Sequence, residues 1–413
     1  MPLHPPIDAA VTRTAVFTSC AANYIPKARV LGSSLKQFHA DIDLYLLLVD
    51  DRPTFPAFVA EPFDAIVTAA ELDIPDFESW IFGHGLVESC TAVKPYMLLS
   101  LLQKGYDHVV YLDPDIAVFS PLTELLCDFT RHSILLTPHQ CKPESDPEAI
   151  KDNEICSLRH GLFNLGFVGV KNDAEGVRYA QWWADRCRYA CYNDIPNGVF
   201  TDQKWNDFVP IFFTGAGILR SPAYNVATWN YSQRVIEGMP ETCVTVDGVP
   251  LVFHHFTGYD SGAHHVMLAK YGSKMPATFL LSQWYEKQCK VLADPELSSV
   301  QWAYGQYSNG EPVCASHRRL YRSRRDLQEQ FPRPLDAAPG GRADSSLVSW
   351  LKREGHWDDN ACPPNRSFQA YLAAMEAELR AHIALSKKLR PWMKQIVNPI
   401  LRRSFAIARL LVG

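Results

Sequence analysis

Short apolar runs alternate with helix-like stretches from about residue 12 to about residue 291. Three of the runs are almost wholly apolar, as strands buried inside a parallel sheet should be, and they span residues 15–18, 44–49 and 109–112. Residues 25–38 carry apolar side chains three or four positions apart, which is the spacing of a helix, and residues 93–102 are also helix-like. This alternation predicts an α/β fold with a mixed, mostly parallel, Rossmann-like sheet flanked by helices.

The pattern changes after about residue 295. An arginine-rich segment spans residues 317–325, and a stretch rich in Pro, Gly, Ala and Asp follows at 332–346 with the composition of a linker. Beyond it the pattern is again largely helical. We therefore expect three parts: an α/β unit (1–295), an arginine-rich segment with a linker (296–366) and a mainly helical C-terminal tail (367–413).

Composition narrows the classes of function. The chain has 47% hydrophobic and 21% charged residues, as globular proteins do, and a formal net charge of −5, which argues against nucleic acid as a partner. Its eleven cysteines contain no Cys-x-x-Cys pair, so we expect reduced thiols rather than a zinc site. We see neither a secretory signal nor a run of 18 apolar residues, which predicts a cytoplasmic protein without a transmembrane helix.

The end of the chain is basic and apolar. Residues 380–413 hold eight Lys or Arg and no Asp or Glu, mixed with Leu, Ile, Val, Trp and Phe. Basic amphipathic helices of this kind lie on anionic membrane surfaces. The alternative is a helix docked on the α/β unit by its apolar side. If the tail binds a membrane surface, the protein is a peripheral protein on the inner face of the membrane.

Asp113 and Asp115, separated by Pro114, directly follow the strand predicted at 109–112. In an open α/β sheet, ligands bind beyond the carboxyl ends of the strands. Two carboxylates one residue apart can converge on one hard cation, and Mg²⁺ or Mn²⁺ also accepts pyrophosphate oxygens as ligands. The alternative is a plain turn, in which Asp and Pro are frequent. This Asp-x-Asp motif is therefore a candidate metal site.

Five further segments carry polar residues beside strand-like or helix-like runs. They are residues 17–24 (Phe-Thr-Ser-Cys-Ala-Ala-Asn-Tyr), 92–96 (Ala-Val-Lys-Pro-Tyr), 162–170 (Leu-Phe-Asn-Leu-Gly-Phe-Val-Gly-Val), 200–206 (Phe-Thr-Asp-Gln-Lys-Trp-Asn) and 252–258 (Val-Phe-His-His-Phe-Thr-Gly). Together with the Asp-x-Asp motif they resemble, in order and spacing, the motifs of the family 8-type retaining glycosyltransferases. The resemblance covers residues 15–258 and implies a GT-A fold, a nucleotide-sugar donor and Mn²⁺ or Mg²⁺ as cofactor.

The resemblance also implies a role for each matching residue. The implied donor-binding residues are Thr18, Asn23, Tyr24, Lys94, Asp113, Asn164 and Gly258. Among them, Asn23 and Tyr24 would meet the base, Lys94 the phosphates and Asn164 the sugar. The implied metal ligands are Asp113, Asp115 and His255. The implied catalytic residues are Asp202, which would hold sugar hydroxyls, and Gln203, which would face the reacting carbon.

Two positions depart from the family's pattern. Ala21 stands where the family usually has an acidic residue, which leaves the base of the donor open. After Gly258 the family often continues with Lys-Pro-Trp, whose Lys contacts a phosphate, but this chain has Tyr-Asp-Ser-Gly at 259–262. We expect that contact to come from elsewhere, with His264, His265 or an Arg as candidates.

These features predict an enzyme, a hexosyltransferase-type glycosyltransferase that moves a sugar from a nucleotide diphosphate donor, with a UDP-sugar favoured. The acceptor would be a glycan or a lipid-linked saccharide, as in polysaccharide or lipopolysaccharide biosynthesis. Gln203 is an amide and a poor base, which favours retention of configuration. Residues 139–159, interpreted as a long polar loop, and Asn225, Trp229 and Asn230 are candidates for the acceptor side.

Two other classes remain as alternatives. A sugar-phosphate nucleotidyltransferase also combines carboxylates, a metal and an α/β sheet, but it should show a glycine-rich loop after the first strand, and residues 18–24 contain no Gly. A non-catalytic, membrane-associated carbohydrate-binding protein would have no need for Asp113, Asp115, Gln203 and His255 together.

Overall fold

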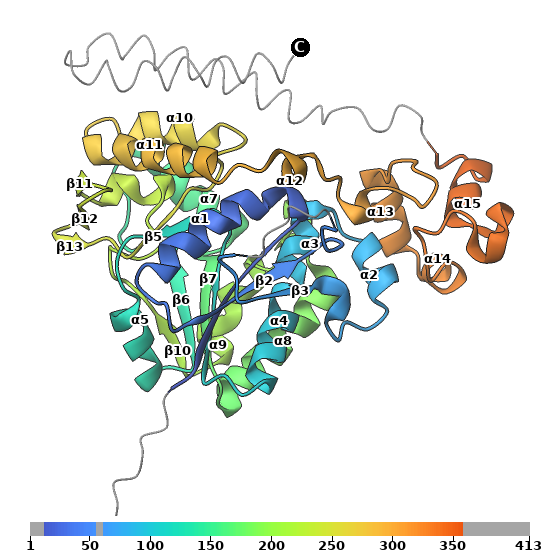
Figure 1. The fold of residues 1–413 in the computed structure, drawn as a ribbon, viewed down its shortest axis with the longest axis horizontal. Coiled ribbons are helices and arrows are strands. Elements are labelled where there is room, and N and C mark those ends of the chain that lie inside the picture. The colour runs from blue at the N-terminus through green and yellow to red at the C-terminus, as the bar shows by residue number, and fades with distance from the viewer. Residues whose placement is uncertain (1–11, 55–60, 358–413) are drawn as a thin grey trace, which may run out of the picture.

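A computed structural model describes residues 12–54 and 61–357. Its centre is a seven-stranded sheet with the strand order β10-β6-β7-β4-β1-β2-β3 (Figure 1). The strands are β1 (Thr14–Cys20), β2 (Asp43–Leu48), β3 (Ala65–Thr68), β4 (His108–Leu112), β6 (Ile134–Pro138), β7 (Phe163–Lys171) and β10 (Ala216–Ile218). Only β7 runs antiparallel to its two neighbours. The predicted α/β class, with a mixed and mostly parallel sheet, is confirmed.

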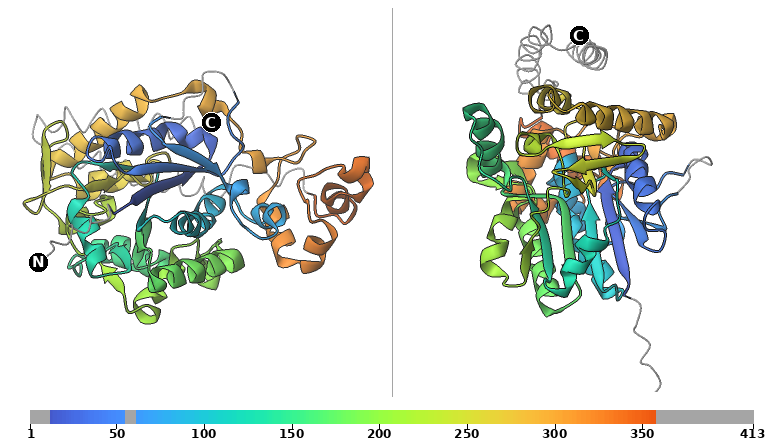
Figure 2. Two further views of the ribbon diagram at one scale, coloured as in Figure 1. Left: turned by 60° about the horizontal axis from the view of Figure 1, so that its bottom comes forward. Right: turned by 90° about the vertical axis from the view of Figure 1, so that its left-hand side faces the viewer.

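Helices cover both faces of this sheet (Figures 1 and 2). Helix α1 (Ile25–Lys36) packs on one face, while α4 (Lys94–Gln103) and α8 (Ala174–Ala190) pack on the other. Side chains alternate along a strand, so Val16 of β1 joins the first core and Phe17 joins the second. Burial on both faces explains why β1, β2 and β4 are continuous apolar runs.

A smaller layer lies beyond the carboxyl ends of the central strands. Here β5 (Ile116–Val118) pairs with β14 (Phe253–His255), and the register sets His255 opposite Ile116. Close by are β11 (Ile236–Met239), β12 (Cys243–Val246) and β13 (Val249–Pro250), with α10 (Ala263–Tyr271) and α11 (Pro276–Val291) packed on them. This pairing brings the chain around residue 255 next to the turn that follows β4.

The remaining elements are short. They are α2 (Phe77–Phe82), α3 (Leu86–Ala92), α5 (Thr123–Cys127), α6 (Pro147–Ala149), a π-helical turn (Ile150–Ile155), α7 (Cys156–His160), β8 (Asn193–Asp194), β9 (Val199–Phe200), α9 (Val209–Phe212) and α12 (Pro295–Ser299). The interpretation of residues 139–159 as one long loop is wrong, because helical turns occupy 147–160. Asp146 starts them as an N-cap whose carboxylate accepts from the backbone N–H groups of Glu148 and Ala149.

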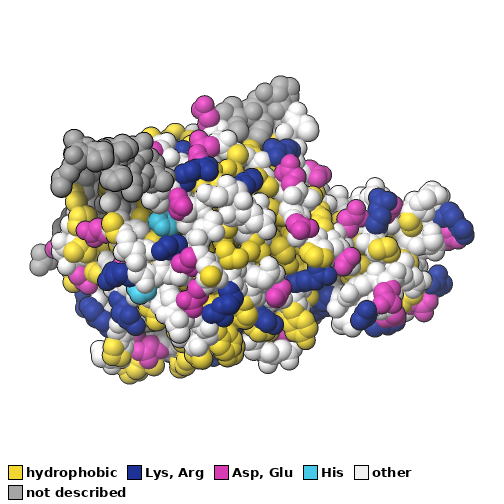
Figure 3. Space-filling view, turned by 90° about the horizontal axis from the view of Figure 1, so that it is seen from below, with side chains coloured by type: hydrophobic (Ala, Val, Ile, Leu, Met, Phe, Trp, Pro, Cys, Tyr) yellow, Lys and Arg dark blue, Asp and Glu magenta, His cyan; other side chains and the backbone are white. Residues whose placement is uncertain are grey.

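The arginine-rich region forms a helical unit rather than an extended segment. Helices α13 (Ala315–Ser323), α14 (Arg325–Gln330) and α15 (Leu347–Arg353) surround an apolar core that also includes Phe82 of α2, and Figure 3 shows this unit as the smaller lobe at the right. The buried guanidinium of Arg318 joins this lobe to the larger body by donating to the carbonyl oxygens of Phe82 (3.0 Å) and His84 (2.9 Å). The domain division at 295 and 366 stays a prediction.

The proposed membrane-binding tail, residues 367–413, lies outside the described residues. Within the described ranges, 12–54 and 61–357, no helix has both the length and the apolar character needed to cross a membrane.

Candidate active site

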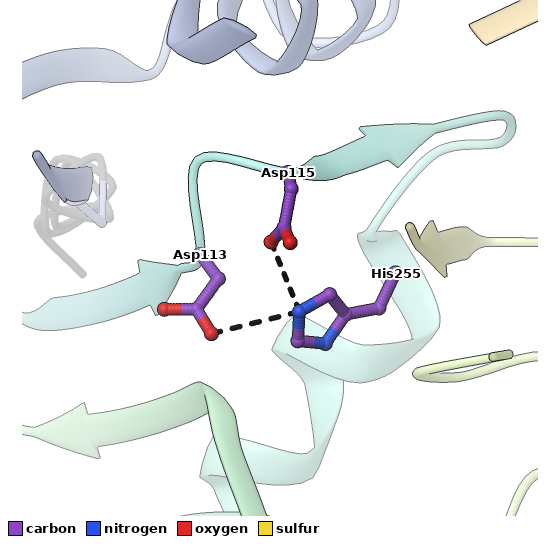
Figure 4. A group of neighbouring side chains, drawn as sticks. All are labelled: Asp113, Asp115 and His255. Carbon is purple, nitrogen blue, oxygen red and sulfur yellow. Dashed lines mark ion pairs between the residues drawn. The ribbon is translucent and has the colours of Figure 1, made fainter. Parts of the chain in front are cut away.

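Asp113, Asp115 and His255 form one cluster at the carboxyl end of β4 (Figure 4). The two carboxylates belong to the turn between β4 and β5, and β14 delivers the imidazole. His255 Nε2 lies 2.9 Å from an Asp115 oxygen and 3.6 Å from an Asp113 oxygen. One ligand atom from each residue lies within 4.8 Å of the others. This oxygen and nitrogen set could bind a divalent metal ion.

The imidazole of His255 is held in the orientation that a metal ligand needs. Its Nδ1 lies 3.2 Å from the side-chain oxygen of Asn164 and 3.3 Å from that of Asn225. Both partners are acceptors, so Nδ1 carries the proton and Nε2 points its lone pair at the carboxylates. Burial alone would lower the pKa of His255, but the negative charges of Asp115 and Asp113 outweigh it and raise that pKa. The cluster therefore attracts a positive charge, either a proton or a cation.

Gly166 of β7 gives this cluster its space. A Cβ atom at this position would lie 2.5 Å from His255 Cε1 and 2.8 Å from the Asp113 oxygen Oδ2. Its carbonyl oxygen also accepts from the backbone N–H of Asp113 at 2.8 Å. The sequence shows this glycine inside the Phe-Asn-x-Gly segment, but only the fold shows why a side chain cannot stand there.

We expect Gly166→Ala to weaken Mn²⁺ binding by about 10- to 100-fold, because the methyl group must displace His255 or Asp113 from the cluster. Electron paramagnetic resonance of free Mn²⁺ measures the affinity. Gly305→Ala is the matched control, since its new Cβ would meet nothing closer than 3.6 Å. Equal Mn²⁺ affinities of the two variants would contradict the metal assignment.

Lys94, at the first turn of α4, lies directly behind the cluster. Its ammonium group lies 3.4 Å from Asp113 and 3.2 Å from Asp202, and it donates to the carbonyl oxygen of Leu165 at 3.1 Å. Burial would lower the pKa of Lys94, yet the two carboxylates raise it, so the group is charged. Asp202 is only 1% exposed, and burial raises its pKa although Lys94 opposes that shift. Lys94 therefore contacts both Asp113 of the predicted metal site and Asp202 of the predicted catalytic segment.

A chain of amides connects the other predicted residues. Asn164 accepts a hydrogen bond from the Asn225 amide (2.9 Å), and Asn225 is held in the left-handed region at φ 47°. The Gln203 oxygen accepts from the backbone N–H of Leu165 (3.0 Å), and its nitrogen donates to the carbonyl of His160 (3.1 Å). Asn225, expected on the acceptor side, thus lies beside the metal cluster and orients His255.

The predicted nucleotide loop is a 3-10 turn, Ala22–Tyr24, between β1 and α1. Burial, followed by the negative charges of Asp115 and Asp260, raises the pKa of Tyr24. Asn23 beside it is exposed, whereas Thr18 is fully buried in β1 and its hydroxyl has no partner among the described residues. Gly258, at φ 69°, follows β14 and accepts from the backbone N–H of His264 at 3.0 Å.

Trp229 closes the other side of the cluster. Its ring centre lies 5.3 Å from that of His255 and 5.2 Å from that of His139. Within the described chain, the indole nitrogen of Trp229 and the Nδ1 atom of His139 have no hydrogen-bond partner. The Trp229 side chain is half-buried, and its indole nitrogen is itself buried. The sequence singled out Trp229 individually and included His139 only as the first residue of the candidate segment 139–159.

No protein-family model matches the chain. Two proteins of Bacillus subtilis strain 168 are similar to it in sequence. The chain is 29% identical to the uncharacterized protein YfnF over 175 residues, which are 42% of this chain and 57% of YfnF. It is 26% identical to the uncharacterized protein YfnD over 248 residues, which are 59% of this chain and 76% of YfnD. The match therefore spans little more than half of YfnF.

Among solved structures, the chain is similar to several glycosyltransferases. The galactosyltransferase LgtC, in complex with donor and acceptor sugar analogues, has 15% identity and a TM-score of 0.39, over 68% of this chain and 98% of LgtC. The glycosyltransferase GlyE of Streptococcus pneumoniae has 17% identity and a TM-score of 0.36, over 70% of this chain and 66% of GlyE. TM-scores below 0.5 do not establish a common fold, so the fold class rests on the strand order. Membership of family 8 stays a resemblance.

Proposed function

We propose that the protein is a metal-dependent glycosyltransferase of the GT-A type that uses a nucleotide diphosphate sugar, with a UDP-sugar favoured. The observation that carries this proposal is the convergence of distant segments at one edge of the sheet. The 113–115 turn, Asn164, the 202–203 pair and His255 come from four places in the chain and form one connected set of contacts. Each was assigned a donor-side role by the resemblance alone.

The residues present fit a divalent cation, since two carboxylates and one oriented imidazole offer their ligand atoms within 4.8 Å. A bound Mn²⁺ or Mg²⁺ would act as a Lewis acid on the diphosphate of the donor. Asn164 and Asn225 hold the imidazole of His255 in place. Lys94 forms an ion pair with Asp113 and adds a positive charge next to the site.

The arrangement around Gln203 favours retention of configuration. Inversion needs a carboxylate base on the far side of the sugar. The carboxylate next to Gln203 is Asp202, which is buried and paired with Lys94, so it is poorly placed to accept a proton. We propose that Gln203 supports the reacting carbon, that Asp202 orients hydroxyl groups of a hexose, and that a saccharide, lipid-linked if the tail binds a membrane, is the acceptor.

A donor panel tests this function without knowledge of the acceptor. Purified protein with Mn²⁺ or Mg²⁺ is incubated with UDP-, GDP- and dTDP-sugars, and release of the nucleoside diphosphate is followed with and without EDTA. We expect slow hydrolysis of one donor that EDTA abolishes, and an α-configured product from an α-configured donor by NMR. Absence of hydrolysis and of any thermal shift with every donor would contradict the proposal, and a β product would contradict retention alone.

A further inference from the structure

Lys27 lies at the edge of the site, on the first turn of α1. Its ammonium group lies 4.3 Å from the ring centre of Tyr24 and 5.9 Å from that of Tyr259. It forms an ion pair with Asp260, which follows β14 in the chain. Tyr259 and Asp260 follow His255 in the chain by four and five residues. No motif of the sequence contains this lysine.

The other charged groups of the site leave a diphosphate largely uncompensated. A diphosphate carries several negative charges at neutral pH. Asp113 and Asp115 together balance the two charges of a divalent cation, and Asp202 balances Lys94. A donor that places its diphosphate on the metal therefore needs a further cation at the edge of the cluster.

The two histidines expected to supply this charge cannot do so. Burial lowers the pKa of His264 to about 3 and also lowers that of His265. Both rings are therefore neutral at pH 7 and can contribute at most a hydrogen bond. The ammonium group of Lys27 lies next to Tyr24, on the side where the resemblance sets the nucleotide.

The ion pair that holds Lys27 is weak enough to be exchanged. The Asp260 side chain is 58% exposed, so water screens its attraction for the ammonium group. The lysine side chain is a flexible four-carbon stem with a compact charge, so it can turn from one oxygen ligand to another. A metal-bound diphosphate offers more negative charge than one carboxylate.

We propose that Lys27 binds the diphosphate of the donor, and that Asp260 holds the ammonium group until the donor enters. This inference rests on the proposed function, because it assumes a metal-bound diphosphate at Asp113, Asp115 and His255. It assigns to α1 a phosphate contact that the 259–262 segment does not supply through a basic residue.

Inorganic pyrophosphate tests the inference without any assumption about the base or the sugar. Isothermal titration calorimetry measures its affinity at a fixed concentration of free Mn²⁺ for the wild type and three variants of Lys27 and Asp260. We expect Lys27→Gln to weaken pyrophosphate binding about 10- to 100-fold, the usual effect of losing a hydrogen bond between charged groups. Lys27→Arg should recover most of the affinity, and Asp260→Asn should bind at least as tightly as the wild type.

Lys36→Gln is the matched control, since Lys36 lies on the same helix, is similarly exposed and also pairs with an aspartate, Asp64. It stands nine residues away, about 13 Å along the helix, and should leave the affinity unchanged. Mn²⁺ affinity without pyrophosphate should not fall in Lys27→Gln.

The outcomes separate the inference from the proposed function. No Mn²⁺-dependent binding of pyrophosphate by the wild type would overturn both. Binding by the wild type with an affinity within twofold in Lys27→Gln would overturn the role of Lys27 and leave the metal-dependent donor site intact. Equal losses in Lys27→Gln and Lys36→Gln would assign the effect to the helix and also overturn the inference.

Discussion

Replacing Asp115 by Asn should abolish metal-dependent hydrolysis of the donor while the free energy of unfolding stays within about 1 kcal/mol of the wild-type value. The carboxylate is a ligand of the proposed cation, and an amide oxygen without charge binds Mn²⁺ or Mg²⁺ far more weakly. Loss of Lewis-acid catalysis worth several kcal/mol lowers the rate about a thousandfold or more. Asp113→Asn should behave in the same way.

The fold should tolerate these changes because the acidic turn is held by its backbone. The N–H of Ile116 donates to the carbonyl of Asp113 at 3.0 Å, and the carbonyl of Asp115 accepts from the N–H of Phe256 at 2.9 Å. Asn keeps the shape of the side chain, and removing one of two adjacent negative charges relieves repulsion. Donor hydrolysis and urea denaturation, measured on the same preparations, check the two halves of the prediction.

Asp185→Asn serves as the control, since Asp185 is an exposed carboxylate on α8 outside the cluster. It should retain full activity and stability. A loss of several kcal/mol in Asp115→Asn, with activity restored by conditions that refold the variant, would instead favour the structural interpretation, in which the acidic pair is a plain turn.

Three strands of the central sheet could be predicted from local pattern because β1, β2 and β4 are largely buried on both faces. Residues 15–18, 44–49 and 109–112 all lie in or overlap β1, β2 and β4, and the predicted helices overlap α1 and α4. The strand order could not be predicted, since β4 and β7 pair across about 60 residues and neither segment has a pattern that specifies which strand it pairs with. The long loop expected at 139–159 was wrong because short helices without a repeating apolar face leave no periodic signal.

The candidate site was predictable only as a set of separate polar residues. The Asp-x-Asp motif is local, so the sequence located it. The amide of Asn225, the space at Gly166 and the position of Lys27 arise from contacts between residues 53 to 233 positions apart, and no local pattern contains them. Asn225 adopts a positive φ that most residues avoid. In this conformation its side chain accepts a hydrogen bond from His255, although the sequence suggested a place on the acceptor side.

Lys94→Met should destabilise the protein by about 3–5 kcal/mol, the typical cost of removing one partner from a buried ion pair. Asp202 is 1% exposed and would lose the ammonium group 3.2 Å away, while Asp113 is partly exposed and loses less. Urea denaturation at pH 7 measures the effect. Lys104→Met, at the exposed end of the same helix, should change the stability little.

The origin of this loss can be separated from a simple packing defect. The double variant Lys94→Met with Asp202→Asn should recover a good part of the stability, because no uncompensated charge then remains buried. A double variant as unstable as Lys94→Met alone would show that Lys94 matters through packing and not through its charge.

The pH dependence gives a second and independent check. Burial already raises the pKa of Asp202 in the wild type, and without Lys94 that pKa rises further. A carboxyl group whose pKa is higher in the folded than in the unfolded state binds more protons when folded, so stability falls as the pH rises through this range. The deficit of Lys94→Met should therefore be largest at pH 7 and should shrink as the pH is lowered toward the ordinary pKa of Asp, about 3.9. If the stability lost in Lys94→Met were the same at pH 7 and at pH 5, Asp202 would stay ionised without its partner. The loss would then not come from an uncompensated buried charge on Asp202.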